Sequence, residues 1–379
     1  MKRQLINCGL LGLLLLTACQ ATEQLSIDYM IPAQVSFPAG LRRVGVVNNA
    51  VETPNFEAFR KEENQEKMWK EWKRNGLAHQ ERYVYGDAVV ATEALAEALA
   101  AENYFDEVVI CDSALRAHDI QRREPTLSRS EVAQLTTELD VDFLIALENL
   151  PIRTSRRVEY LSESSALAAI DVKVFPVIQI YQPNSGRRNI VLHATDSIYW
   201  ERGGSNPARA NVLLPDDRQL VREASQFAGS VPVKRILPSW KTAERTLYLS
   251  GGANMRDAAV YTREKNWDAA IGLWQQVYNK KNTRKKVRMY AACNLALGYE
   301  MKDEFDQARA WILKACDLAA AVYHIDVNAS PVVLSKLSLY QAVACMNILQ
   351  YAAELKGREQ NAALLKEQTE QFNNPIAPL

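Results

Sequence analysis

The sequence has few residues of the kinds that hold metal ions or act as nucleophiles. Its 379 residues include only four histidines, and none has a partner at metal-ligand spacing. These are His79, His118, His193 and His324. The H-E-x-x-H, G-x-S-x-G, Walker and G-x-G-x-x-G motifs are all absent. We therefore predict no metal site, no cofactor and no enzymatic activity, and keep an enzyme acting on envelope glycans as a third-ranked alternative.

Cysteine is also sparse, and the sequence contains no C-x-x-C pair. Beyond the amino terminus the chain has four cysteines: Cys111, Cys293, Cys316 and Cys345. Their wide spacing indicates neither a zinc site nor a disulfide framework. Three of them fall in predicted helices, where they are expected to be small core residues. A disulfide between Cys293 and Cys316 is the alternative.

Neither sign of charge is in excess. Lys and Arg total 45 residues, and so do Asp and Glu. This balance provides no long-range attraction for nucleic acid, which we exclude as a partner. Apolar residues make up 48% of the chain, which at this length is enough for two cores.

The sequence has no apolar run long enough to cross a membrane as a helix. Its amino-terminal run, from Leu5 to Leu16, follows Lys2 and Arg3. A helix of about twelve residues rises about 18 Å, whereas a hydrocarbon core is about 30 Å thick. A charged start followed by a short apolar run is typical of a signal peptide, which we assign to residues 1–18.

The run ends in Leu16-Thr17-Ala18-Cys19, which resembles the bacterial lipobox. The resemblance implies cleavage before Cys19 and acylation of its thiol, with two or more acyl chains providing a stable anchor. Gln20 stands where Asp usually signals retention in the inner membrane, so the resemblance implies an outer-membrane lipoprotein. The sequence does not decide between the periplasmic face and the cell surface.

Residues 19–40 are predicted to form an extended, lipidated tether, because Pro32 and Pro38 disfavour helix. Residues 41–250 are then predicted to form a mixed α/β domain. Strands are predicted at 41–47, 107–111, 142–147, 168–181 and 189–200, and helices after Asp87, after Ser128 and at 216–228. The last two strands would form a long hairpin through Pro183-Asn184-Ser185-Gly186. This order predicts one sheet with helices packed against it.

The layout of part of the chain resembles the small α/β domain of periplasmic assembly lipoproteins, as in the curli-secretion channel subunit and the amino-terminal domain of TolB. The resemblance is carried by the stretches "YFDEVVICD", "LDVDFLIAL" and "VFPVIQIYQPNSGRRNIVLHATDSIYW". It covers roughly residues 41–230 and concerns the fold rather than function. Through "LSIDYMIPAQVSFPAGLRRVGVVNN", the chain also resembles an uncharacterised family of Bacteroides-type lipoproteins.

Residues 251–372 are predicted to be all helical, with a short tail at 373–379. Small and aromatic residues recur with a spacing that resembles tetratricopeptide repeats, whose unit is about 34 residues. The first set is Ala258, Tyr261, Trp267, Ala270, Trp274 and Val277, and the second is Ala296, Tyr299, Phe305, Ala308, Ile312 and Ala315. A third helical pair at about 331–355 and 358–371 would cap the array. The predicted fold class is therefore α+β.

Three features are candidates for binding. The stretch 56–76 carries Trp69 and Trp72, which are expected to pack on the α/β domain. The basic segment 280–288 is expected to be a solvated loop, with an acidic lipid or acidic partner as the alternative. The third candidate is the concave surface of the repeats, which would either bind a partner or brace the neighbouring domain. Its predicted residues are Arg263, Tyr290, Asn294, Leu297 and Met301.

The leading interpretation is an outer-membrane-anchored lipoprotein that acts as a protein-interaction or scaffold module in envelope assembly. Its predicted partners are the membrane, through the lipid on Cys19, and an envelope protein. The second interpretation is a subunit of an oligomeric envelope secretion channel that inserts the 168–200 hairpin into the bilayer. Asp171, Lys173, His193 and Asp196 in that hairpin favour a covered sheet instead.

Overall fold

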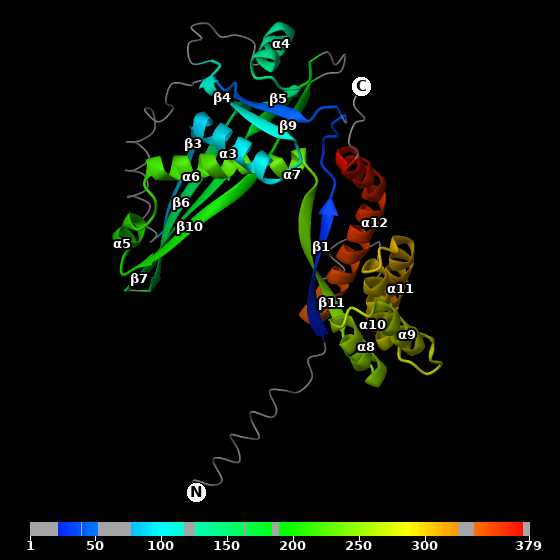
Figure 1. The fold of residues 1–379 in the computed structure, drawn as a ribbon. Coiled ribbons are helices and arrows are strands. Elements are labelled where there is room, and N and C mark those ends of the chain that lie inside the picture. The colour runs from blue at the N-terminus through cyan, green and yellow to red at the C-terminus, as the bar shows by residue number, and fades with distance from the viewer. Residues whose placement is uncertain are drawn as a thin grey trace. The chain divides into compact units, whose positions relative to one another are not determined.

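The computed structural model describes residues 22–38, 40–51, 77–116, 126–162, 164–183, 189–324 and 337–373. The chain divides into two compact units. The sheet unit comprises Pro32–Ser239 and Glu367–Leu379, and the helical unit comprises Met1–Ile31 and Trp240–Lys366. Figure 1 shows the elements of each unit. This content confirms the α+β class.

The centre of the sheet unit is a five-stranded sheet in the order β4-β2-β5-β8-β9. Its strands are β2 (Arg43–Asn48), β4 (Glu107–Ala114), β5 (Phe143–Asn149), β8 (Val177–Tyr181) and β9 (Ile190–His193). β2 runs parallel to both β4 and β5, and its residues from Val44 to Asn48 are all buried. Continuous burial is expected of parallel strands that are covered on both faces.

A second sheet of four antiparallel strands has the order β10-β7-β6-β3. Its strands are β3 (Leu77–Tyr85), β6 (Pro151–Ser162), β7 (Ser165–Val174) and β10 (Asp196–Gly204). The prediction of one sheet is therefore wrong, and β3 and β6 were not predicted. Charged residues interrupt the apolar–polar alternation that would have marked these two strands, so their sequences resembled loops.

The predicted hairpin of two long strands is also divided between the sheets. β7 and β10 pair in the four-stranded sheet, whereas β8 and β9 pair in the five-stranded sheet. The first break is at Phe175-Pro176, because proline has no N–H to donate to a strand ladder. There the Phe175 N–H donates to the carbonyl of Pro151 (2.9 Å), and the Ala194 N–H donates to the carbonyl of Pro176 (3.1 Å).

The helices of the sheet unit begin where the sequence predicted. Asp87 caps α3 (Ala88–Ala101), Ser128 and Glu131 form a capping box on α4 (Arg129–Glu138), and Asp216 caps α6 (Asp217–Ser230). Two short helices, α5 (Pro207–Val212) and α7 (Val233–Ile236), complete the set. One core joins α3 and α6 to both sheets, and a second core lies under α4 on the other face of the five-stranded sheet (Figure 1).

The helical unit contains α8 (Ala253–Arg263), α9 (Trp267–Asn279), α10 (Lys285–Glu300), α11 (Phe305–Tyr323) and α12 (Leu339–Asn373, assigned to this unit as far as Lys366). Trp274 is fully buried in its core, and α9 and α10 approach closely because Gly298 faces Ile271 and Trp274 without a side chain. α12 continues through residues 355–358, where a break between two helices was predicted. A helix-interior glycine such as Gly357 costs about 1 kcal/mol but does not end a helix.

The helical unit also contains a two-stranded sheet of β1 (Thr22–Ile31) and β11 (Ser239–Tyr248). Part of the predicted tether is therefore a strand, because residues 22–31 pair with β11, and the side-chain hydrogen bonds between the two strands join residues 218 and 222 positions apart. Alternate β1 side chains, including Ile27 and Tyr29, are buried. Within the residues described, no helix combines the length and hydrophobicity needed to span a membrane.

Candidate functional site

The surface predicted to bind a partner is occupied by the chain's own strand β11. Asn294 is fully buried, and its amide accepts from the N–H of Tyr248 (2.9 Å) and donates to the Tyr248 carbonyl (2.8 Å). Tyr290 stacks on the Tyr248 ring with a centroid distance of 4.3 Å, and Leu297 is 1% exposed. Asn294 and Tyr290 thus hold β11, and all three residues are buried.

The other two predicted residues lie apart from that contact. Arg263 is exposed and forms an ion pair with Glu23 of β1 (2.6 Å). Met301, at the end of α10, is 37% exposed. The structure therefore uses Tyr290 and Asn294 to hold β11, places Leu297 in the core of the helical unit, and leaves Arg263 and Met301 outside this contact.

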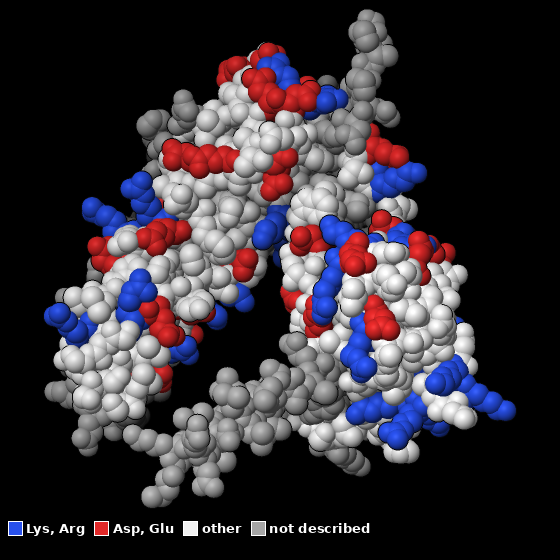
Figure 2. Space-filling view, turned by 60° about the horizontal axis from the view of Figure 1, so that its bottom comes forward, with Lys and Arg blue, Asp and Glu red and all other residues white. Residues whose placement is uncertain are grey.

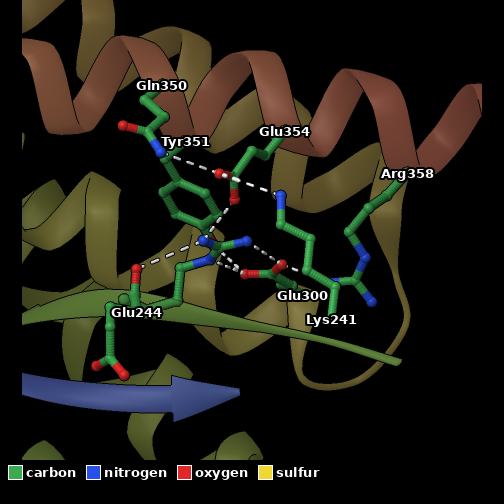
Figure 3. A network of polar contacts seen from close by, with 8 residues as sticks. Lys241, Glu244, Glu300, Gln350, Tyr351, Glu354 and Arg358 are labelled. Atoms are coloured by element: carbon green, nitrogen blue, oxygen red, sulfur yellow. Dashed lines mark hydrogen bonds and ion pairs between the residues drawn. The ribbon is translucent and has the colours of Figure 1, made fainter. Parts of the chain in front are cut away.

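A buried ionic network next to this contact was not predicted from the sequence (Figure 3). Arg245 of β11 donates through Nε and Nη2 to the two carboxylate oxygens of Glu300 in α10, at 2.9 and 3.0 Å. Its Nη1 donates to Glu354 of α12 at 2.8 Å. Glu300 also accepts from the hydroxyl of Tyr351 (2.7 Å) and from Arg358. The side chain of Glu300 is completely buried, and that of Arg245 is 4% exposed.

The network favours the charged forms of Arg245 and Glu354 and the neutral form of Tyr351. Burial opposes the charge of Arg245, but hydrogen bonds and attraction from Glu300 raise its pKa above the ordinary value. Burial likewise opposes the charge of Glu354, yet hydrogen bonds from Gln350 and Arg245 lower the pKa of that carboxyl. Burial, together with the charge of Glu300, raises the pKa of Tyr351. Arg245, Glu354 and Tyr351 therefore each keep one protonation state near neutral pH.

A polar cavity of about 360 Å³ lies beside the network, within the size range of small-ligand sites. Its walls come from β1, β11, α10 and α12. The polar lining residues are Gln24, Lys241, Thr242, Glu244, Arg245, Thr246, Asn347, Gln350, Tyr351 and Glu354. Figure 3 shows Lys241 and Glu354, which both line the cavity, reaching toward one another; the Lys241 amine lies 3.9 Å from the Glu354 carboxylate.

The cavity has polar groups for recognition rather than an evident reactive group. Cys293 lines it, but burial raises the pKa of this thiol, so that it stays protonated and poorly nucleophilic. Among the residues described, the four cysteines are free thiols, and no group of His, Cys, Asp and Glu side chains is arranged to hold a metal ion.

A second polar cluster lies in the sheet unit, where β2 and β5 end. Glu148 accepts a hydrogen bond from Asn49 and another from the hydroxyl of Tyr181, both at 2.7 Å. The Nε of Arg116 donates to the Asn49 side chain at 2.8 Å, and the Leu127 N–H donates to the Tyr181 hydroxyl at 2.9 Å. Burial raises the pKa of Glu148 to about 7, against the effect of its hydrogen-bond donors.

The position of this cluster has a topological reason. The next strand of this sheet along the chain after β2 is β4, which lies on one side of β2. The strand after that is β5, which lies on the other side. The carboxyl ends of β2 and β5 therefore meet at the point where the strand order reverses, which is where open α/β sheets commonly bind ligands. The sequence signal was a polar Asn48-Asn49 after one buried strand and Glu148 at the end of another.

Two of the predicted features lie outside the described residues, namely Cys19 and the Trp69–Trp72 stretch. The basic segment is described. Lys280, Lys281, Arg284, Lys285 and Lys286 are all exposed at the start of α10.

The chain is thus an α+β protein whose helical unit packs against β11 and contains a polar cavity. A family model described as Domain of unknown function (DUF8603) matches residues 41–248, and one described as Domain of unknown function (DUF6340) matches residues 256–357. Because the first covers more than half of the chain, the protein belongs to the DUF8603 family. No curated protein and no solved structure matches the chain.

The ionic network makes a first prediction. Glu300→Gln removes the buried carboxylate that Arg245 and Arg358 share, and we expect it to lower the free energy of unfolding of the helical unit by about 3–5 kcal/mol. Urea unfolding followed by circular dichroism measures this loss. The matched control is Glu304→Gln, which removes an ion pair with Lys302 from a half-exposed side chain and should have little effect. Equal stability of the two variants would contradict the prediction.

The second polar cluster makes a prediction about pH. The pKa of Glu148 is about 7 in the folded chain against an ordinary 4.5, so the folded state holds this proton more tightly than the unfolded state. Its contribution to stability is therefore present below pH 4.5 and lost as the pH rises to 7. Relative to Glu148→Gln, the wild-type protein should lose about 1–3 kcal/mol between pH 5 and pH 8. Glu93→Gln, on the exposed face of α3, should show no such difference.

Proposed function

We propose that this protein is an outer-membrane-anchored lipoprotein that binds a protein partner in the cell envelope. The observation that carries the binding proposal is the polar cavity between β11 and α12. It is open, it is lined by hydrogen-bonding groups, and a buried ionic network fixes its walls. Preorganised polar walls favour recognition, because binding then orders few additional side chains.

The architecture of the helical unit supports the same proposal. The helices α8 to α11 follow one another in pairs, and the aromatic and small residues of the predicted tetratricopeptide-like pattern, such as Trp274 and Ala308, lie in its core. We propose that these pairs form a short tetratricopeptide-like array. Arrays of this kind present extended surfaces to polypeptides. Here part of that surface holds β11, so the partner would use the cavity next to it.

The location proposal depends on the amino-terminal sequence. Leu16-Thr17-Ala18-Cys19 follows a short apolar run, and the resemblance to lipoproteins implies that Cys19 is acylated.

Lipidation is tested by metabolic labelling with an alkyne-bearing fatty acid. We expect the wild-type chain to take up the label and Cys19→Ser to lose it entirely, because serine forms no thioether with diacylglycerol. Cys8→Ser, in the expected signal peptide, is the matched control and should still yield labelled protein. Label retained by Cys19→Ser, or lost by both variants, would contradict the anchor.

Partner binding is tested by photo-crosslinking in intact cells. The photoreactive residue p-benzoylphenylalanine replaces Asn347, which is exposed and lines the cavity, or Asp317, which is exposed on α11 away from it. We expect one discrete protein adduct from position 347 and none from position 317. An absence of adducts at 347, or the same adducts at both positions, would overturn the cavity as the binding site.

A further inference from the structure

A concentrated positive charge lies where α9 leads into α10. Between Asp268 and Glu300 the sequence has no acidic residue but six basic ones, all within residues 280–288. We call the five exposed ones the basic face: Lys280, Lys281, Arg284, Lys285 and Lys286. Figure 2 shows Lys and Arg side chains gathered at the lower right, with hardly any acidic side chain among them.

The stability of α10 does not explain this arrangement. The start of a helix carries a partial positive charge, so acidic residues stabilise it and basic ones do not. α10 has no acidic residue in its first turn, and Arg284 at its N-cap provides no side-chain cap. Cations gathered at such a position repel one another and the helix dipole, and an anion bound there would relieve that repulsion.

The loop that carries the basic face is held in place. Arg288 donates through Nη2 to the carbonyls of Lys280 (3.1 Å) and Lys281 (3.2 Å). The hydroxyl of Thr283 donates to the carbonyl of Val277 (2.9 Å). The basic side chains therefore project from a fixed backbone.

One residue of the basic face, Lys286, is connected to the start of β1 through two stacked tyrosines. Side-chain hydrogen bonds join Gln24 to Thr246 and Ser26 to Glu244, and continuing this antiparallel register places Thr22 opposite Tyr248. Tyr248 stacks on Tyr290, and the Lys286 amine lies 5.8 Å from the centre of the Tyr290 ring. These contacts connect the basic face to the end of the strand that follows the expected lipid attachment.

The covalent chain limits how far that end lies from the lipid. Cys19 is three residues before Thr22, and three residues span at most about 10 Å. A lipid on Cys19 would therefore hold this end of the helical unit close to the phospholipid headgroups. Headgroups are the anions that such an anchor brings nearest to the basic face.

We infer that the basic face binds anionic phospholipid headgroups and adds an electrostatic contact to the lipid anchor. The inference rests on the proposed lipidation of Cys19. Lys and Arg side chains near an anionic bilayer attract it additively, and the attraction weakens with salt because it acts over a Debye length. Together with the lipid anchor, this electrostatic contact would also fix the orientation of the helical unit relative to the bilayer.

The test separates this contact from the anchor. The chain from Gln20 onward retains every described residue but has no lipid. It is sedimented with vesicles of phosphatidylcholine alone, or of phosphatidylcholine with 30 mol% phosphatidylglycerol, at low and high salt. We expect binding to the anionic vesicles only, with affinity reduced at least tenfold by high salt and at least tenfold by Lys280→Ser, Lys281→Ser, Arg284→Ser and Lys285→Ser combined.

The matched control removes the same number of charges from exposed positions of the sheet unit, through Arg129→Ser, Arg209→Ser, Arg218→Ser and Lys234→Ser. This variant should bind as tightly as the unsubstituted chain. Equal losses in both variants would assign the effect to net charge and overturn the inference. So would equal binding to neutral vesicles, or no binding to anionic ones. Fatty-acid labelling at Cys19 does not depend on any of these outcomes, so it reports separately on the anchor.

Discussion

The helical unit depends on one buried carboxylate, Glu300. It accepts hydrogen bonds from Arg245 of β11 and from Tyr351 and Arg358 of α12. A charge without solvent is tolerated only when its partners are all in place, so this carboxylate requires β11, α10 and α12 to be together. The ribbon of β1 and β11 is therefore part of the helical unit, although both strands are far from α10 in sequence.

Local sequence signals predicted the elements that depend on neighbouring residues. Asp87, Ser128 with Glu131, and Asp216 each cap a helix within three residues of their own position, and each prediction is confirmed. The buried strands β2 and β5 were likewise visible as apolar runs. Such signals require no knowledge of distant contacts. The α+β class followed from them.

The contacts that define the candidate site are non-local, and this is why the sequence did not reveal them. Arg245 and Glu300 are 55 positions apart, and each looks like an ordinary surface charge. Asn294 was predicted to face a partner because the register of the tetratricopeptide-like repeats places it on their concave surface. Its amide instead satisfies both backbone groups of Tyr248, as a neighbouring strand would. The long hairpin was misjudged for a similar reason, since only the pairing partners show that Pro176 separates two sheets.

The strand β1 changes what a lipid on Cys19 would do. A flexible tether of about twenty residues has a root-mean-square span of about 25 Å and would let the protein turn freely above the bilayer. With residues 22–31 paired to β11, three residues remain between the lipid and a fixed strand, and they reach at most about 10 Å. A short connection selects which end of the helical unit meets the headgroups. Lys286 of the basic face is connected to that end through the stacked rings of Tyr290 and Tyr248, so the anchor and the basic face would favour the same orientation.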